Sequence, residues 1–152
     1  MKLQHMELIF DAIFFIIIVI GISIPFFTYA FRNKLNIKNS ILKFGIFFFL
    51  NLIIVGILTL ILTYWSEEIS KNIILENYGF NFDGMNDSEY YQNVKSENIT
   101  RITEIRNSMF GIGWPLKAIF VFLFFSLPYI FLSTLALNII EYNKKKKELQ
   151  IT

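Results

Sequence analysis

One uncharged run near the end of the chain limits the possible folds more than any other feature. The segment from Pro115 to Ile140 has 26 residues and a single charge, Lys117, and its last 23 residues, 118–140, are all uncharged. A helix rises about 1.5 Å per residue and the hydrocarbon core of a bilayer is roughly 30 Å thick, so about 20 apolar residues cross it. A water-soluble helix needs a polar face, and none is visible here at helical spacing. We therefore expect a transmembrane helix at about 115–140.

Two further apolar runs have the same character. One covers about residues 8–31 and carries one charge, Asp11, and the other covers about residues 41–65. Charged residues make up only 17% of the 152-residue chain, whereas soluble domains carry about 25%. The sequence predicts an all-α integral membrane protein, with one membrane domain over residues 1–152 and three transmembrane helices.

The first run also has features of a cleavable secretory signal. Lys2 precedes it, Pro25 interrupts it, and Thr28 to Ala30 place small residues at cleavage-type positions. Against this reading, Glu7 and Asp11 do not fit the positively charged start that a signal requires. Cleavage would also leave both basic segments of the chain on the outer side. We therefore expect this first helix to be retained.

The charges of the connecting segments predict an orientation. Residues 32–40 carry three positive charges, the tail 141–152 contains four consecutive lysines, and the 48-residue loop 66–113 carries eight acidic and four basic residues. Lys and Arg near the ends of spans favour the cytoplasmic side. We expect a cytoplasmic (inner) membrane, with the N-terminus and the loop outside and the C-terminus inside. The residues expected to anchor this topology and to attract anionic lipid are Arg32, Lys34, Lys38, Lys144, Lys145, Lys146 and Lys147.

The loop is expected to be partly helical. Residues 66–78 can form a short helix, and residues 77–87 contain the glycines and Asp-Gly of a turn. Apolar residues then recur at helical steps over 88–109. The loop also concentrates aromatic side chains among its acidic groups, which suggests a docking surface for a partner; the alternative is that they rest on the lipid interface or cover the helix ends. These aromatic residues are Tyr78, Phe80, Phe82, Tyr90 and Tyr91.

Polar residues within the apolar runs are costly unless they are paired or lie near the surface. Asp11 and Lys117 occupy similar depths near the outer end, which predicts an ion pair between the first and third helices. The alternative is that each side chain reaches the headgroups independently, as lysine does readily. Lys43 and Asn138 occupy matching depths near the inner end.

Three residues deeper in the expected membrane can meet. Ser23, Asn51 and Ser133 lie at similar distances from the inner boundary. We interpret them as adhesion between helices rather than an ion or proton path, because such paths carry acidic groups at mid-membrane and none here lies deeper than Asp11.

Small residues form a stripe along the second helix. Gly45, Gly56, Thr59 and Thr63 fall on one narrow arc at helical spacing. Such a stripe lets another backbone approach closely, either within the chain or in another copy.

The chain lacks the residue types that most catalytic and metal sites require. It has no cysteine and one histidine, His5 near the start of the chain, so a zinc site is not expected. Glycine-rich phosphate loops and the nucleophile motif G-x-S-x-G are absent. The net charge of +2 does not indicate a nucleic-acid partner. We expect no catalytic residues, no cofactor and no enzymatic activity.

The expected layout resembles that of known small membrane proteins only in part. Three spans with the N-terminus outside resemble one holin topology, although the 48-residue loop is longer than that resemblance implies. Small bacterial immunity proteins are similar in size and hydropathy. The sequence favours a non-enzymatic accessory, immunity-type or complex subunit that lies in membrane lipid and binds another membrane or extracytoplasmic protein through its loop and helix faces. The alternative is a homo-oligomeric, holin-like pore or small channel lined by Ser23, Asn51 and Ser133.

Overall fold

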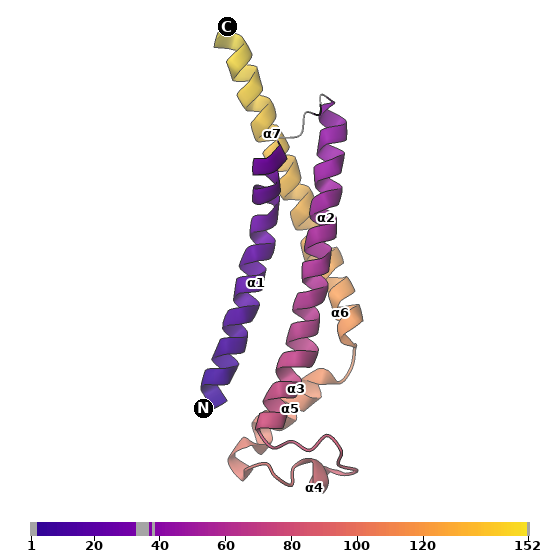
Figure 1. The fold of residues 1–152 in the computed structure, drawn as a ribbon. Coiled ribbons are helices and arrows are strands. Elements are labelled where there is room, and N and C mark those ends of the chain that lie inside the picture. Colours follow the sequence, from indigo (N-terminus) through magenta and orange to yellow (C-terminus); the bar gives the residue numbers. More distant parts are fainter. Residues whose placement is uncertain (1–2, 33–36, 38, 152) are drawn as a thin grey trace. The chain divides into compact units, whose positions relative to one another are not determined.

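The computed structural model describes residues 3–32, 37 and 39–151, and it describes the side chains of all of these except residues 3, 4, 32, 145 and 148–151. Every regular element in this part of the chain is helical, which confirms the predicted all-α class (Figure 1). The elements in chain order are α1 (Leu3–Arg32), α2 (Ser40–Tyr64), η1 (Trp65–Ile69), α3 (Ser70–Asn77), α4 (Asp87–Tyr90), η2 (Ser96–Asn98), α5 (Ile99–Met109), α6 (Trp114–Val121), η3 (Phe122–Ser126) and α7 (Leu127–Ile151).

Three of the helical stretches are long and apolar enough to cross a bilayer. They are His5–Phe31, Ser40–Asn77 and Trp114–Lys144. The second consists of α2, η1 and α3 without a break, and the third consists of α6, η3 and the first part of α7. Both η1 and η3 are single π-helical turns, which interrupt an α-helix without ending it. The three apolar runs in the sequence therefore correspond to three long helices.

The chain divides into two compact units, and the boundaries between them fall within α1, α2 and α6. The first unit contains Met1–Ile16 and Leu60–Ala118, and the second contains Ile17–Thr59 and Ile119–Thr152. We describe each unit by itself.

The short helix expected over residues 66–78 is not separate from the helix of the second apolar run: η1 and α3 continue α2 without a break to Asn77. Residues 66–77 contain no glycine or proline, so nothing in their backbone stops the helix. It ends at Gly79, which has φ +85. The amides of Gly79 and Phe80 donate to the carbonyls of Glu76 and Leu75, both at 3.0 Å. This pattern is a Schellman motif, in which glycine adopts the left-handed conformation at low cost.

The predicted helix over residues 88–109 is two shorter helices, α4 and α5, separated by a turn and by η2. Asn86 caps α4, because its side chain accepts a hydrogen bond from the amide of Glu89 at 3.1 Å. The apolar residues whose spacing predicted a single helix over 88–109 all contribute to the core of the first unit. Ile102 and Ile105 are buried in it, and Tyr91, Val94 and Met109 pack against it.

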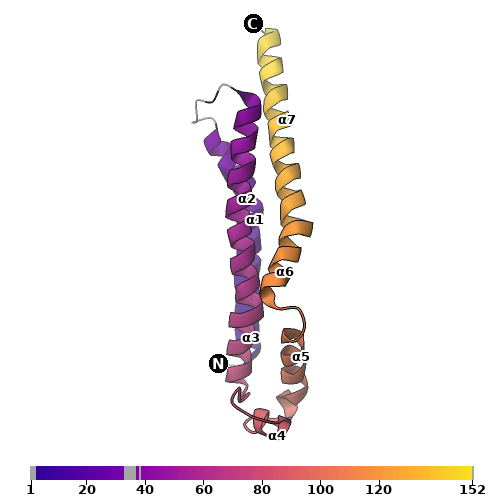
Figure 2. The ribbon, with the colours of Figure 1, turned by 90° about the vertical axis from the view of Figure 1, so that its right-hand side faces the viewer.

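The core of the first unit joins α3, the turn after it and α5. Its buried members are Ile74, Leu75, Phe80, Ile102 and Ile105, and Met6 and Phe10 of α1 pack against them. Figure 2 shows α3 and α5 side by side. The free energy gained by burying these apolar side chains offsets the conformational entropy that the segment loses when it becomes ordered.

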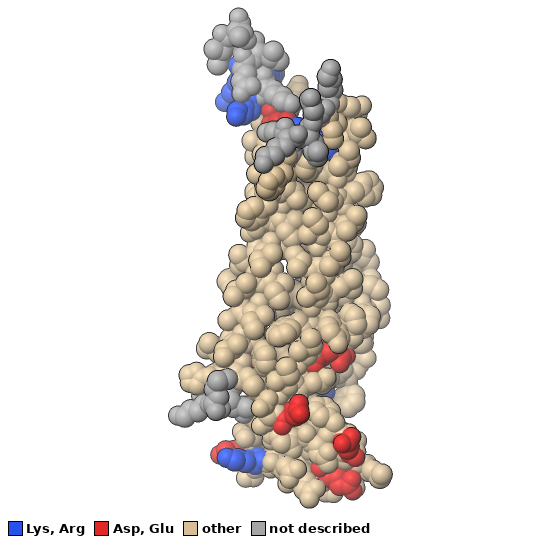
Figure 3. All heavy atoms as spheres, viewed as in Figure 1, with Lys and Arg blue, Asp and Glu red and all other residues tan. Residues whose placement is uncertain are grey.

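The second unit has a narrow core and a large apolar surface. Ile24 of α1, Val55 of α2 and Ile130 of α7 form the buried cluster. Many large apolar side chains of the second unit point outward, among them Phe27, Ile41, Phe49 and Phe125. On the face shown in Figure 3, the charged side chains of the second unit lie near the C-terminal end of α7, and the rest of the described surface of this unit is uncharged. A continuous apolar surface of this kind is unfavourable in water and is typical of helices that face lipid.

Candidate functional site

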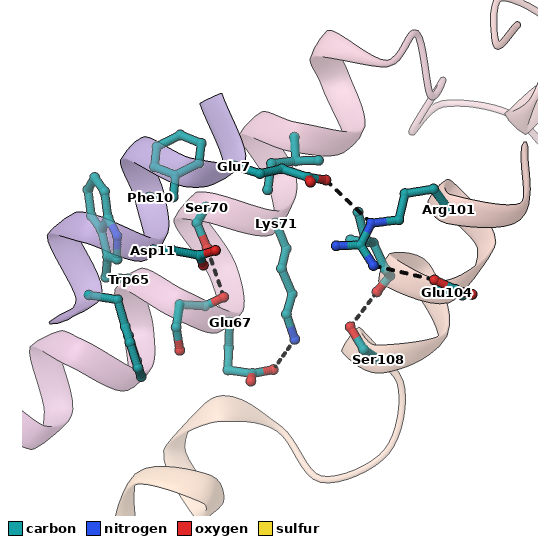
Figure 4. Close-up of a pocket in the computed structure, with 14 residues that line it drawn as sticks. Glu7, Phe10, Asp11, Trp65, Glu67, Ser70, Lys71, Arg101, Glu104 and Ser108 are labelled. Carbon is teal, nitrogen blue, oxygen red and sulfur yellow. Dashed lines mark hydrogen bonds and ion pairs between the residues drawn. The ribbon is translucent and has the colours of Figure 1, made fainter. Parts of the chain in front are cut away.

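A charged pocket of about 410 Å³ in the first unit is the clearest candidate site. Three helical segments form it: the beginning of α1, the continuous helix η1–α3, and α5 (Figure 4). Phe10, Phe14 and Trp65 supply aromatic lining, and the rings of Phe10 and Trp65 meet edge to face with centroids 5.9 Å apart. We call this the charged pocket. Its charged residues are Glu7, Asp11, Glu67, Lys71, Arg101 and Glu104.

Ion pairs hold most of these charges in place. Arg101 joins α5 to α1, because its Nε lies 3.4 Å from Oε1 of Glu7, and its Nη1 lies 3.4 Å from Oε2 of Glu104. Burial alone would lower the pKa of Arg101, but the two carboxylates raise it above its ordinary value. Arg101 therefore keeps its positive charge.

Glu67 receives two ammonium groups. Lys71 lies one turn further along the same helix, with Nζ 2.8 Å from Oε2 of Glu67, and Lys117 of α6 contacts the same oxygen. Lys117 also donates to the backbone carbonyl of Ser108 at 3.4 Å. Glu67 thus connects η1, α3 and α6 within the first unit.

The predicted ion pair between Asp11 and Lys117 is not present. Lys117 pairs with Glu67 instead. The second long helix continues beyond Trp65, so Glu67 lies beside the beginning of the third long helix. Asp11 is exposed and lines the charged pocket (Figure 4), and it forms no ion pair within the described part of the chain. The pocket lining therefore holds four carboxylates and two basic groups, an excess of negative charge.

The hydroxyl groups at the pocket are engaged locally. Ser66, Ser70 and Ser108 each donate to a backbone carbonyl of the preceding turn, at 3.3, 2.9 and 2.6 Å respectively. The lining contains neither histidine nor cysteine. Among the residues that the structure describes, no three His, Cys, Asp or Glu side chains are grouped closely enough to hold a metal ion. The pocket can therefore offer charge and aromatic surface.

The expected meeting of Ser23, Asn51 and Ser133 does not occur. Ser23 donates to the carbonyl of Val19 and Ser133 to that of Ile130, each within its own helix. Asn51 is 2% exposed and contacts Thr28 of α1, with 2.7 Å between Oδ1 and Oγ1. Serine side chains in helices commonly donate to a carbonyl of the preceding turn, and this is the hydrogen bond that each of the two serines makes here.

Lys43 forms an ion pair with Glu141 of α7. Glu141 is the first residue of the polar tail 141–152. The distance from Nζ to Oε1 is 3.5 Å. The neighbouring Asn138 lies half-buried on α7, one turn before Glu141. The pair forms because α7 continues without a break from the apolar run into the tail.

The small-residue stripe divides into two parts. A Cβ atom at Gly56 would lie 3.3 Å from the ring of Phe122, and the hydroxyl of Thr59 lies 3.0 Å from that of Ser126, so this part faces η3 in the second unit. A Cβ atom at Gly45 would meet no neighbouring atom within 4 Å. Thr63 is buried within the first unit.

The aromatic residues expected to dock a partner mostly form the core of the first unit. Phe80 is 8% exposed, with Tyr90 stacked on it at 5.5 Å and Tyr91 edge-on at 5.6 Å. Tyr78 is half-buried, and its hydroxyl donates to Oε1 of Glu7 at 3.4 Å. Phe82, at 50%, is the most exposed of the five. The docking interpretation is therefore wrong for Phe80, because this residue anchors the fold of the loop.

The basic residues expected to anchor the topology are only partly described. Lys144, Lys146 and Lys147 lie exposed on the last turns of α7. Arg32 is the last residue of α1. Lys34 and Lys38, and the side chains of Arg32 and Lys145, lie outside the described residues.

Comparison with protein-family models, with characterised proteins and with solved structures gives no match to this chain.

Proposed function

We propose that this protein spans a cytoplasmic (inner) membrane three times and serves as a non-enzymatic accessory, immunity-type or complex subunit. The first unit, with the charged pocket, lies outside the cell and the end of α7 lies in the cytoplasm. The apolar surface of the three long helices and the exposed lysines on α7 support this layout.

The absence of cysteine makes this orientation straightforward to test. Met85 is 91% exposed in the first unit, and Lys147 is exposed near the end of α7. An impermeant maleimide should label Met85→Cys in intact cells and label Lys147→Cys only after the cells are opened. Labelling in the opposite order reverses the proposed orientation.

The observation that carries the proposed function is the excess of carboxylates in the charged pocket. Asp11 is exposed there without an ion pair in the described part of the chain, in a pocket that Phe10, Phe14 and Trp65 also line. Carboxylates and aromatic faces together attract a cation, because both present negative potential to it. The pocket therefore recognises a lysine or arginine side chain of another membrane or extracytoplasmic protein.

Site-specific photo-crosslinking tests this function. A benzophenone amino acid at Ser108, in the pocket, should give one defined adduct with the partner, and the same group at Asn93, an exposed position outside it, should give none. Asp11→Lys should abolish the adduct. Asp83→Lys makes the same charge change at an exposed position outside the pocket and should keep it. An adduct that survives Asp11→Lys, or that never forms, contradicts the proposal.

The alternative of a homo-oligomeric pore gains no support from the residues expected to line it. Asn51 is buried within the second unit, and Ser23 and Ser133 bond to their own helices. A pore lining needs polar groups on an outward face.

A further inference from the structure

A small cavity in the second unit lies among α1, α2 and α7. Its volume is about 10 Å³. This is close to the smallest space that holds one water molecule, about 10–15 Å³. Its polar lining residues are Thr28 of α1, Asn51 of α2 and Thr134 of α7, and Tyr29 of α1 also lines it.

Thr134 has a buried hydroxyl group that the described chain leaves without a partner. The residue is 3% exposed, and its Oγ1 forms no hydrogen bond within the described residues. Threonine in a helix usually donates to a carbonyl of the preceding turn, as Thr59 does to Val55 at 2.8 Å. A buried hydroxyl without a hydrogen bond is unfavourable, so we expect a hydrogen-bond donor or acceptor beside it.

The amide of Asn51 also has an unused end. The hydroxyl of Thr28 lies 3.0 Å from the carbonyl oxygen of Pro25 and 2.7 Å from the amide end of Asn51. A hydroxyl has one proton and cannot donate to both oxygens. If it donates to Pro25, the NH₂ group of Asn51 donates to Thr28 and the amide oxygen remains; if it donates to Asn51, the NH₂ group remains. In either orientation, one end of a side chain that is 2% exposed has no bond within the described residues.

We propose that this cavity binds a single water molecule, which bridges the amide of Asn51 and the hydroxyl of Thr134. A water molecule both donates and accepts, so it serves either orientation of the amide, and buried waters typically make about three hydrogen bonds. Thr28 supplies the third polar group. The lining contains no carboxylate, which a bare cation would need at such a depth. The water links α1, α2 and α7 beside Pro25, which interrupts the backbone bonding of α1.

Solution NMR on the full chain in detergent, with threonine methyl groups labelled with ¹³C, detects this water directly. The Thr134 methyl signal is assigned as the one missing from Thr134→Val. It should show a cross-relaxation peak to water with the sign of a long-lived bound molecule. Thr100 is exposed on α5 and should not show this sign.

The stability of Thr134→Val provides a second, independent readout. Valine has the same shape without the hydroxyl, so the variant is expected to fold. If the cavity holds water, valine removes a hydrogen bond and the thermal midpoint should fall below that of the parent chain, while Thr100→Val should leave it nearly unchanged. In a dry cavity valine removes an unpaired hydroxyl, and the midpoint should stay or rise. Either the absence of the water peak or an unchanged or higher midpoint overturns the proposal.

Discussion

Lys43 on α2 and Glu141 on α7 form a buried ion pair in the second unit, with 3.5 Å between Nζ and Oε1 and side-chain exposures of 9% and 11%. At this burial the contact between the two charges matters for stability, because an ion removed from water must be compensated by close partners. The pair joins the ends of two long apolar helices.

Removing one member of this pair should destabilise the protein more than removing both. We expect Glu141→Leu or Lys43→Met alone to cost on the order of 3 kcal/mol, because each removes this contact from a charge that stays buried. The double variant Lys43→Met with Glu141→Leu should recover most of that loss. Unfolding of the purified variants in detergent gives the three free energies, and additive single effects would show that the two side chains act independently.

The two glycines of the α2 stripe should respond differently to the same substitution. Alanine favours a helix over glycine by about 1 kcal/mol, and at Gly45 the added methyl meets nothing within 4 Å. Gly45→Ala should therefore be neutral or stabilising. At Gly56 the methyl would lie 3.3 Å from the ring of Phe122, so Gly56→Ala should gain less and Gly56→Leu should destabilise. Thermal midpoints measured by circular dichroism test this order, and equal effects at the two glycines would contradict the packing of Gly56 on Phe122.

Phe80 lies at the centre of the aromatic cluster of the first unit, where its ring contacts those of Phe82, Tyr90 and Tyr91. Phe80 is buried between Tyr90 and Tyr91, and truncating a buried phenylalanine costs about 3–5 kcal/mol. We expect Phe80→Ala to expose the loop 78–98 to limited proteolysis, whereas Met85→Ala, at a position that is 91% exposed in the same loop, should leave the digestion pattern unchanged. Equal protection of both variants would mean that the aromatic cluster does not order the loop.

Most of the fold follows from local sequence, because a long uncharged run dictates a helix whatever surrounds it. The three long helices and the apolar face of residues 91–109 were predictable on this basis. The stop at Gly79 was also readable, since glycine just after a helical pattern is the usual C-terminal signal, although we expected a separate short helix over residues 66–78.

The contacts between helices were not predictable in the same way. Hydropathy sets the depth of a residue but not the rotation of its helix or the point where the helix ends. Lys117 therefore meets Glu67 rather than Asp11, and Asn51 meets Thr28 rather than a serine. The charged pocket combines residues more than ninety positions apart, such as Glu7 and Arg101, and no spacing rule connects them.

The phenol of Tyr78 should make the stability of the first unit sensitive to alkaline pH. Burial, and then the carboxylate of Glu7 that accepts its hydrogen bond at 3.4 Å, raise the pKa of Tyr78 above its ordinary value of 10.0. In the unfolded chain the phenol ionises at the lower, ordinary pKa. Its contribution to stability is therefore fully present below about pH 10 and is lost as the pH rises through the higher pKa of the folded state.

Tyr78→Phe removes this titration and should flatten the corresponding part of the pH dependence. We expect the difference in unfolding free energy between the parent chain and Tyr78→Phe to be constant up to about pH 10 and to decrease above it. Tyr142→Phe, at an exposed position on α7, is the matched control and should keep the parent profile. Urea titrations in detergent at a series of pH values measure these differences. If the curves of the parent chain and Tyr78→Phe stay parallel through the alkaline range, the contact between Tyr78 and Glu7 does not contribute to the stability of the folded state.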